Sequence, residues 1–153
     1  MRETMERECH ARIFIGGRST GYKGKYPGIL EEFRIAMEFN HPIYLVGAFG
    51  GVTKDIVEAL HGRRSDIFSN EYHLRNSDYS NFFTLFNQKH RENNIDYSTL
   101  YSSIRDLGFE GLSNLNGLNV KDNLRLALTP HISEIVYLIM KGLTSYFAAK
   151  KDD

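Results

Sequence analysis

Glycines that directly follow two short apolar runs are the residues of this sequence best suited to chemistry. The first group is Gly16 and Gly17, and the second is Gly47, Gly50 and Gly51. Without a β-carbon, a glycine can turn the chain tightly and let a ligand approach backbone N–H groups. Because the start of a helix adds partial positive charge to such amides, phosphate is the ligand they most often hold. The alternative is that these glycines only form tight turns.

Side chains near these glycines could complete a nucleotide site. Arg18 could hold a phosphate with its planar guanidinium fork, or it could be a solvent-facing loop arginine. An aromatic ring at Tyr22 or Phe49 could lie against a base, although each could also be an ordinary packing residue. Thr53 could contact phosphate or cap the helix that follows the second glycine group. These residues therefore define a candidate site that rests on the two glycine groups.

Two glutamates could bind the ribose of such a ligand. Glu31 and Glu32 open the first predicted helix, about one turn from the first glycine loop. Acidic residues are also favoured near a helix start by the helix dipole alone. We expect one of the two to contact ribose hydroxyls.

The elements that would position these residues alternate between strands and helices. Residues 12–15 and 43–46 are predicted strands, the second apolar throughout, as in a parallel sheet covered on both faces. Apolar residues at helical spacing predict helices over 29–37 and 52–60. Two further helices are predicted over 78–92 and 96–107, opened by Asp78 and Asp96, which are suited to capping. The remaining predictions are a loop over 108–119, a strand over 124–128, and a final helix with Thr129 as its N-cap and Pro130 in its first turn.

This alternation predicts an α/β chain with a Rossmann-like three-layer fold and a mainly parallel sheet. Ligands of such folds bind beyond the carboxyl ends of the strands, where both glycine groups would lie. We expect a polar lead-in over residues 1–10 and a single domain over residues 11–148. Asn123 and Arg125 would contact a ligand only if the third strand presents them at that same edge.

Composition restricts the function classes. The 153 residues hold 19 Lys and Arg against 19 Asp and Glu, so a broad attraction for nucleic acid is not built in. A run of about 20 apolar residues that could cross a membrane is missing, and the single Cys9 fits a reducing cytoplasm. The six histidines show no metal-ligand spacing. We therefore expect a cytoplasmic protein with no metal site, no required cofactor and no membrane partner, and with nucleic acid an improbable ligand.

The order of four short motifs resembles the SLOG superfamily, named for the Smf/DprA and LOG proteins. These motifs are IFIGGR, PGILEE, YLVGAFGG, and NGL followed by DNLRLALTPHISEIVYLIMKGL. The similarity spans roughly residues 11–144. Within this superfamily, the sequence most resembles the group of domains attached to sirtuin, TIR or phosphorylase-like domains in bacterial antiphage systems.

The resemblance implies a Rossmann-like domain that senses nucleotides. Its expected ligand is an NAD-derived second messenger, such as a cyclic ADP-ribose isomer or ADP-ribose. Its expected partners are an attached or separate effector of sirtuin, TIR or nuclease type and further copies of the chain, as a homo-oligomer. Ligand binding would alter how the helices of residues 78–107 pack against a neighbouring subunit.

One departure from the LOG pattern favours binding over hydrolysis. LOG enzymes carry P-G-G-x-G-T-x-x-E, with the glutamate acting at the ribose, and alignment on Gly50 places Lys54 at the glutamate position. A lysine cannot replace that carboxylate. The alternative function is a nucleotide N-glycosidase or deoxyribosyltransferase-like enzyme that uses Glu31, Glu32 or Asp55. A DNA-binding module of the DprA kind is disfavoured by the neutral charge.

Overall fold

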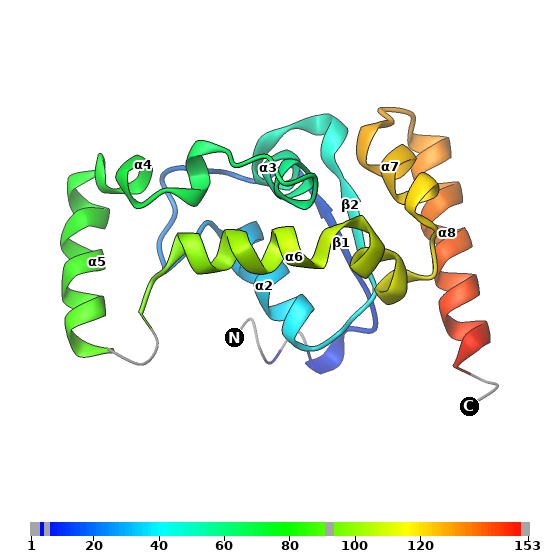
Figure 1. The fold of residues 1–153 in the computed structure, drawn as a ribbon, viewed down its shortest axis with the longest axis horizontal. Helices are drawn as coiled ribbons and strands as arrows, with labels where there is room; N and C mark the ends of the chain where they lie inside the picture. Colours follow the sequence, from blue (N-terminus) through cyan, green and yellow to red (C-terminus); the bar gives the residue numbers. More distant parts are fainter. Residues whose placement is uncertain (1–3, 5–6, 91–93, 151–153) are drawn as a thin grey trace.

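The computed structural model describes residues 4, 7–90 and 94–150 of the chain. Its two strands, β1 (Arg12–Ile15) and β2 (Ile43–Val46), pair in parallel, with Ile13 opposite Tyr44 and Ile15 opposite Val46. Both strands and their parallel pairing are as predicted. Because the strands run in one direction and end in register, the first and second glycine groups begin at the same edge of the sheet (Figure 1).

Helices α2 (Gly28–Glu38) and α3 (Gly51–Leu60) follow the strands as predicted, α3 after a short 3-10 turn at Gly47–Phe49. The apolar stripe of α2 buries Leu30 and Phe33, since residues three apart lie on one face of a helix. Asn40, at φ 53°, lies between this helix and Pro42, at the stop that the sequence predicts. The β1–α2–β2 unit is thus the Rossmann-like part of the fold.

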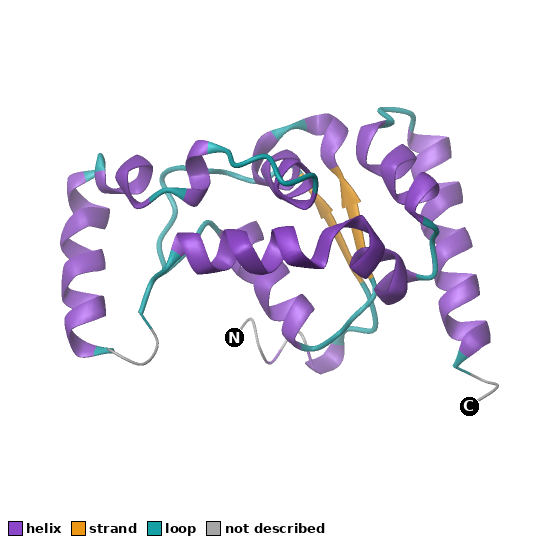
Figure 2. Ribbon diagram, in the orientation of Figure 1, coloured by secondary structure: helices purple, strands orange, loops and turns teal. Residues whose placement is uncertain are grey.

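Helices make up most of the rest of the chain (Figure 2). The connection over 62–77 contains a 3-10 turn at Asp66–Phe68 and a short helix, α4 (Asn70–Leu74). Helix α5 (Ser77–Lys89) begins after Asn76, whose side chain accepts from the Tyr79 amide, so the aspartate cap expected at Asp78 is wrong. Residues 91 and 92 of that predicted helix lie outside the described residues. The expected cap at Asp96 is confirmed, because its carboxylate accepts from the Ser98 and Thr99 amides.

The third strand expected over 124–128 is wrong, as is the loop expected over 108–119. Helix α6 (Tyr97–Asn116) runs through the glycine-rich segment, broken only at Gly108, and ends at Gly117 in the left-handed conformation. Residues 124–128 then belong to helix α7 (Val120–Leu128), which the Asn119 side chain caps by accepting from the Asp122 amide. The described sheet therefore has two strands.

The final helix is present, although its start differs from the prediction. Helix α8 (Ile132–Ala149) has His131 at its N-cap, with no side-chain cap. The Thr129 hydroxyl accepts from the His131 amide and donates to Glu134 at 2.6 Å, so Thr129 orders the turn between α7 and α8. Pro130 lies in that turn and outside the first turn of α8.

The two faces of the sheet belong to two cores. Phe14 and Leu45 on one face pack with α2, α3 and α6, while Tyr44 and Val46 on the other pack under α7 and α8. β2 is buried throughout, as expected for a covered strand, but Ile13 and Ile15 of β1 are about half exposed. A sheet covered on both faces is therefore found at β2 only. Among the described residues, no helix is long and apolar enough to cross a membrane.

Candidate functional site

The two glycine loops bind each other at the carboxyl edge of the sheet. The carbonyl of Gly16 accepts from the Thr53 amide at 2.9 Å, and that of Gly17 accepts from the Val52 amide at 3.2 Å. A β-carbon on Gly51 would lie 2.4 Å from the Gly17 carbonyl oxygen, so the loops can cross only where that residue lacks a side chain. Two amides at the start of α3 are thus occupied, and a phosphate here must use other donors.

The glycines fall into a closed set and an open set. In the closed set, an added β-carbon at Gly17 would lie 2.7 Å from Ile29 Cγ1, and one at Gly47 would lie 2.9 Å from the Ala127 carbonyl oxygen. Gly16 and Gly50 have open space instead, with nothing within 4 Å of an added β-carbon, and both have positive φ, 65° and 75°. The closed positions therefore fix the packing of the loops, and the open ones are where a ligand could approach the backbone.

The side chains predicted beside the loops differ in their access to this edge. Arg18 and Phe49 are exposed; Phe49 directly precedes the open Gly50, and Arg18 is two residues after the open Gly16. Thr53 is fully buried and its hydroxyl has no partner among the described residues, while α3 has Gly50 at its N-cap and no side-chain cap. The capping role considered for Thr53 is therefore wrong, because the carbonyls of the first loop cap α3 instead.

Glu31 and Glu32 lie on α2, the helix that follows the first loop. Glu31 Oε2 is 3.9 Å from the point where a β-carbon on Gly24 would lie, which brings this carboxylate against residues 16–28 of the loop. Glu32 is partly exposed on the same helix, α2.

A cavity of about 780 Å³ opens between the first loop and helices α4 and α5. The loop residues that line it follow Arg18 directly, and Tyr72 donates to Ser19 at 3.2 Å across it. Its lining combines aromatic and charged side chains, namely Tyr22, Tyr72, His73, Tyr79 and Phe82 with Lys23, Arg75 and Asp78. The volume is within the range of small-molecule sites, and one loop connects the cavity to the edge of the sheet.

Three residues that line this cavity, Tyr22, His73 and Tyr79, belong to one hydrogen-bonded chain with the buried Tyr97. His73 Nε2 lies 2.8 Å from the carbonyl oxygen of Ile67, which can only accept, so Nε2 carries the proton of the neutral ring. Its Nδ1 therefore accepts from the Tyr22 hydroxyl at 2.8 Å. That hydroxyl lies 2.8 Å from the Tyr97 hydroxyl, which lies equally close to the Tyr79 hydroxyl.

Burial controls the protonation of this cluster. It lowers the pKa of His73 and raises the pKa values of Tyr22, Tyr79 and Tyr97, so each ring prefers its neutral form. The His73 ring also stacks on Tyr97 with centroids 4.1 Å apart. Tyr22 is thus held by its hydroxyl and leaves only part of its ring to the cavity.

Sequence reasoning included Tyr22 but missed the residues that surround it. His73 lies on a helix of five residues in a polar segment without clear periodicity, and its partner Tyr97 is 24 positions away. Ser69 was an available signal, because its side chain caps α4 by accepting from the Tyr72 amide.

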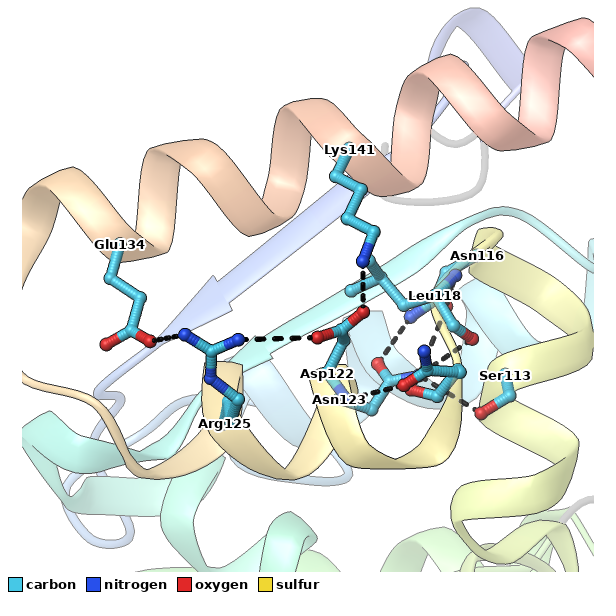
Figure 3. A network of polar contacts seen from close by, with 9 residues as sticks. Ser113, Asn116, Leu118, Asp122, Asn123, Arg125, Glu134 and Lys141 are labelled. Carbon is cyan, nitrogen blue, oxygen red and sulfur yellow. Dashed lines mark hydrogen bonds and ion pairs between the residues drawn. The ribbon is translucent and has the colours of Figure 1, made fainter.

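Asn123 and Arg125, considered as ligand contacts, have structural partners instead (Figure 3). Asn123 Oδ1 accepts from Asn116 at 2.8 Å in a buried amide network, and Arg125 pairs with Asp122 and Glu134. These residues fix α7 between α6 and α8. Their position on α7 removes the third-strand edge on which a ligand role depended.

Comparison with known proteins agrees with this fold. The family model described as SLOG cluster2 matches residues 1–126, which is most of the chain. No curated protein and no solved structure matches the sequence at a significant level. The matched region contains the β1–α2–β2 unit, both glycine loops and the cavity, and the chain belongs to the SLOG family.

Proposed function

We propose that this SLOG domain binds a nucleotide-derived ligand, of NAD-derived type such as ADP-ribose or a cyclic isomer, and through it regulates an attached or partner effector in antiphage defence. The observation that carries the proposal is the path of residues 16–28. This loop starts at the shared edge of two parallel strands, where Gly16 is open, and continues as a wall of the 780 Å³ cavity. One ligand could contact both ends of it.

The chemistry along this path suits a ligand with phosphates and a base. Arg18, two residues after the open Gly16, offers a charge-assisted fork, and Lys23 and Arg75 add two cations at the cavity. Aromatic rings of Tyr72 and Phe82 provide surfaces on which a base can lie. The ligand would act on an effector by binding one arrangement of the domain more tightly than another.

Binding is tested by mass spectrometry of small molecules released from the purified protein, then by calorimetry with NAD, ADP-ribose and cyclic ADP-ribose isomers. Arg18→Ala removes one charge-assisted contact and should weaken binding roughly tenfold to hundredfold. Arg105→Ala is the matched control, because Arg105 is an exposed arginine that pairs with Asp106 on α6, away from the loop. Equal affinity in all three proteins would place the ligand elsewhere.

The glycosidase alternative rests on Asp55. This carboxyl is half-buried on α3, and burial raises its pKa, which is the direction that favours a protonated general acid. Release of free nucleobase from the same nucleotides, lost in Asp55→Asn and kept in Arg105→Ala, would favour the enzyme. Binding without base release would favour the sensor.

A further inference from the structure

Large apolar side chains lie exposed on one side of the sheet and of α8. They are Ile13 and Ile15 of β1, and Ile132, Val136, Tyr137, Met140 and Phe147 of α8, each 40–63% exposed. Apolar surface of this extent is unusual on a soluble domain and marks an interaction site.

The two groups share one side of the molecule. Ile13 and Ile15 are in register with Tyr44 and Val46, so all four side chains lie on the face of the sheet that α8 covers. On α8, Ile132, Val136 and Met140 are spaced by four residues and form one stripe beside the buried Ile135 and Ile139.

The charges of α8 in this region are on its other flank. Glu134 and Lys141 point toward α7, where Glu134 pairs with Arg125 and Lys141 lies 2.6 Å from Asp122 (Figure 3). All seven side chains of the exposed surface are uncharged, so two copies of it can meet without like-charge repulsion.

The area is sufficient for a stable pair. At roughly 100 Å² for each of seven large side chains, the surface amounts to about 700 Å² per copy, close to the ~800 Å² per partner of a standard interface. We propose that β1 and the exposed flank of α8 form a self-complementary interface with the same surface of a second copy, related by a two-fold axis. This differs from contact through residues 78–107, and its test needs no ligand.

The oligomeric state of matched variants tests the interface. Met140→Glu and Leu85→Glu introduce the same charge at side chains that are both 58% exposed, one within the surface and one on α5. Light scattering after size exclusion measures the mass of each protein at about 50 μM, a concentration above the micromolar dissociation constants of the weaker interfaces of this size. The parent and Leu85→Glu should both be dimers. Met140→Glu should give a monomer, because the two-fold axis buries one unpaired carboxylate from each copy, at about thirtyfold each, so that a micromolar dissociation constant rises roughly a thousandfold to the millimolar range.

Folding is followed by circular dichroism, and Val136→Glu provides a second variant in the surface in case one of them unfolds. A parent that is monomeric at this concentration would overturn the proposal. So would a dimeric Met140→Glu or Val136→Glu protein that is folded. A monomeric Leu85→Glu protein would move the interface to α5 and overturn it as well.

Discussion

Gly51 and Gly16 offer a direct test of how the two glycine loops hold each other. Both have φ of 65°, so an alanine at either position has the same backbone strain. They differ in space, because a β-carbon at Gly16 meets nothing within 4 Å whereas one at Gly51 would lie 2.4 Å from the Gly17 carbonyl oxygen and 2.7 Å from the Gly16 carbonyl carbon.

The size of the difference follows from those contacts. Strain from positive φ should cost Gly16→Ala about 1–2 kcal/mol of unfolding free energy. Gly51→Ala should lose this and, in addition, the bonds from the Val52 and Thr53 amides, at about 1 kcal/mol each. The total for Gly51→Ala is therefore about 3–4 kcal/mol, which for a chain of this size lowers the melting temperature by roughly 6–16 °C.

Urea unfolding followed by circular dichroism measures both variants against the parent protein. Equal losses of stability in Gly16→Ala and Gly51→Ala would refute the crossing of the loops as the reason for a glycine at position 51. A stable Gly16→Ala protein also serves in ligand titrations, because it changes the open glycine while keeping the loops together. Gly50 is less suitable for that purpose, since its φ of 75° and ψ of −154° suit glycine alone.

Three further outcomes concern buried polar groups. The pKa of His73 is lowered by burial below its ordinary value of 6.5, so its contribution to stability is complete above pH 6.5 and is lost as the pH falls through the lower, folded-state pKa. Urea unfolding between pH 7.5 and 5 should show this loss, and His73→Gln should reduce it. Tyr97→Phe removes the hydroxyl between Tyr22 and Tyr79 and should cost about 1–3 kcal/mol in the same assay, and an unchanged midpoint would mean that the hydroxyl chain adds nothing. Asn116→Ala removes the 2.7 Å bond to the Ile43 carbonyl and the other bonds of that amide, so we expect a loss of about 3 kcal/mol, and a loss below 1 kcal/mol would contradict the amide network.

Residues 12–60 were predictable because local signals and tertiary packing agree there. Two short apolar strands, glycines after each, and amphipathic helices led to the parallel pair and to α2 and α3. What the sequence could not show is that the glycines contact each other across the loops, since Gly51 and Gly17 are 34 positions apart. The open and closed positions are alike in sequence, and only the packing separates them.

The C-terminal half was harder to predict because its signals are ambiguous. The alternation in residues 124–128 is typical of a strand, yet Leu126 and Ala127 are buried with Asn123 on one face of a helix. The deciding signal is the Asn119 cap, which precedes the segment. Gly108 does bend the chain, at φ 55°, but the helix resumes after it, so glycine content alone misled the prediction of a loop.

The contact between Gly47 and α7 joins the second glycine loop to the C-terminal helices. An added β-carbon at Gly47 would lie 2.9 Å from the carbonyl oxygen of Ala127, so the second glycine loop packs against the end of α7 with no room for a side chain between them. From α7, the ion pairs of Arg125 and Lys141 continue to α8. A ligand that displaced the second loop toward α7 would therefore press on the Ala127 end of this helix, which is ion-paired to α8. Occupancy at the sheet edge and the geometry of a neighbouring copy would then be mechanically coupled over the width of the domain.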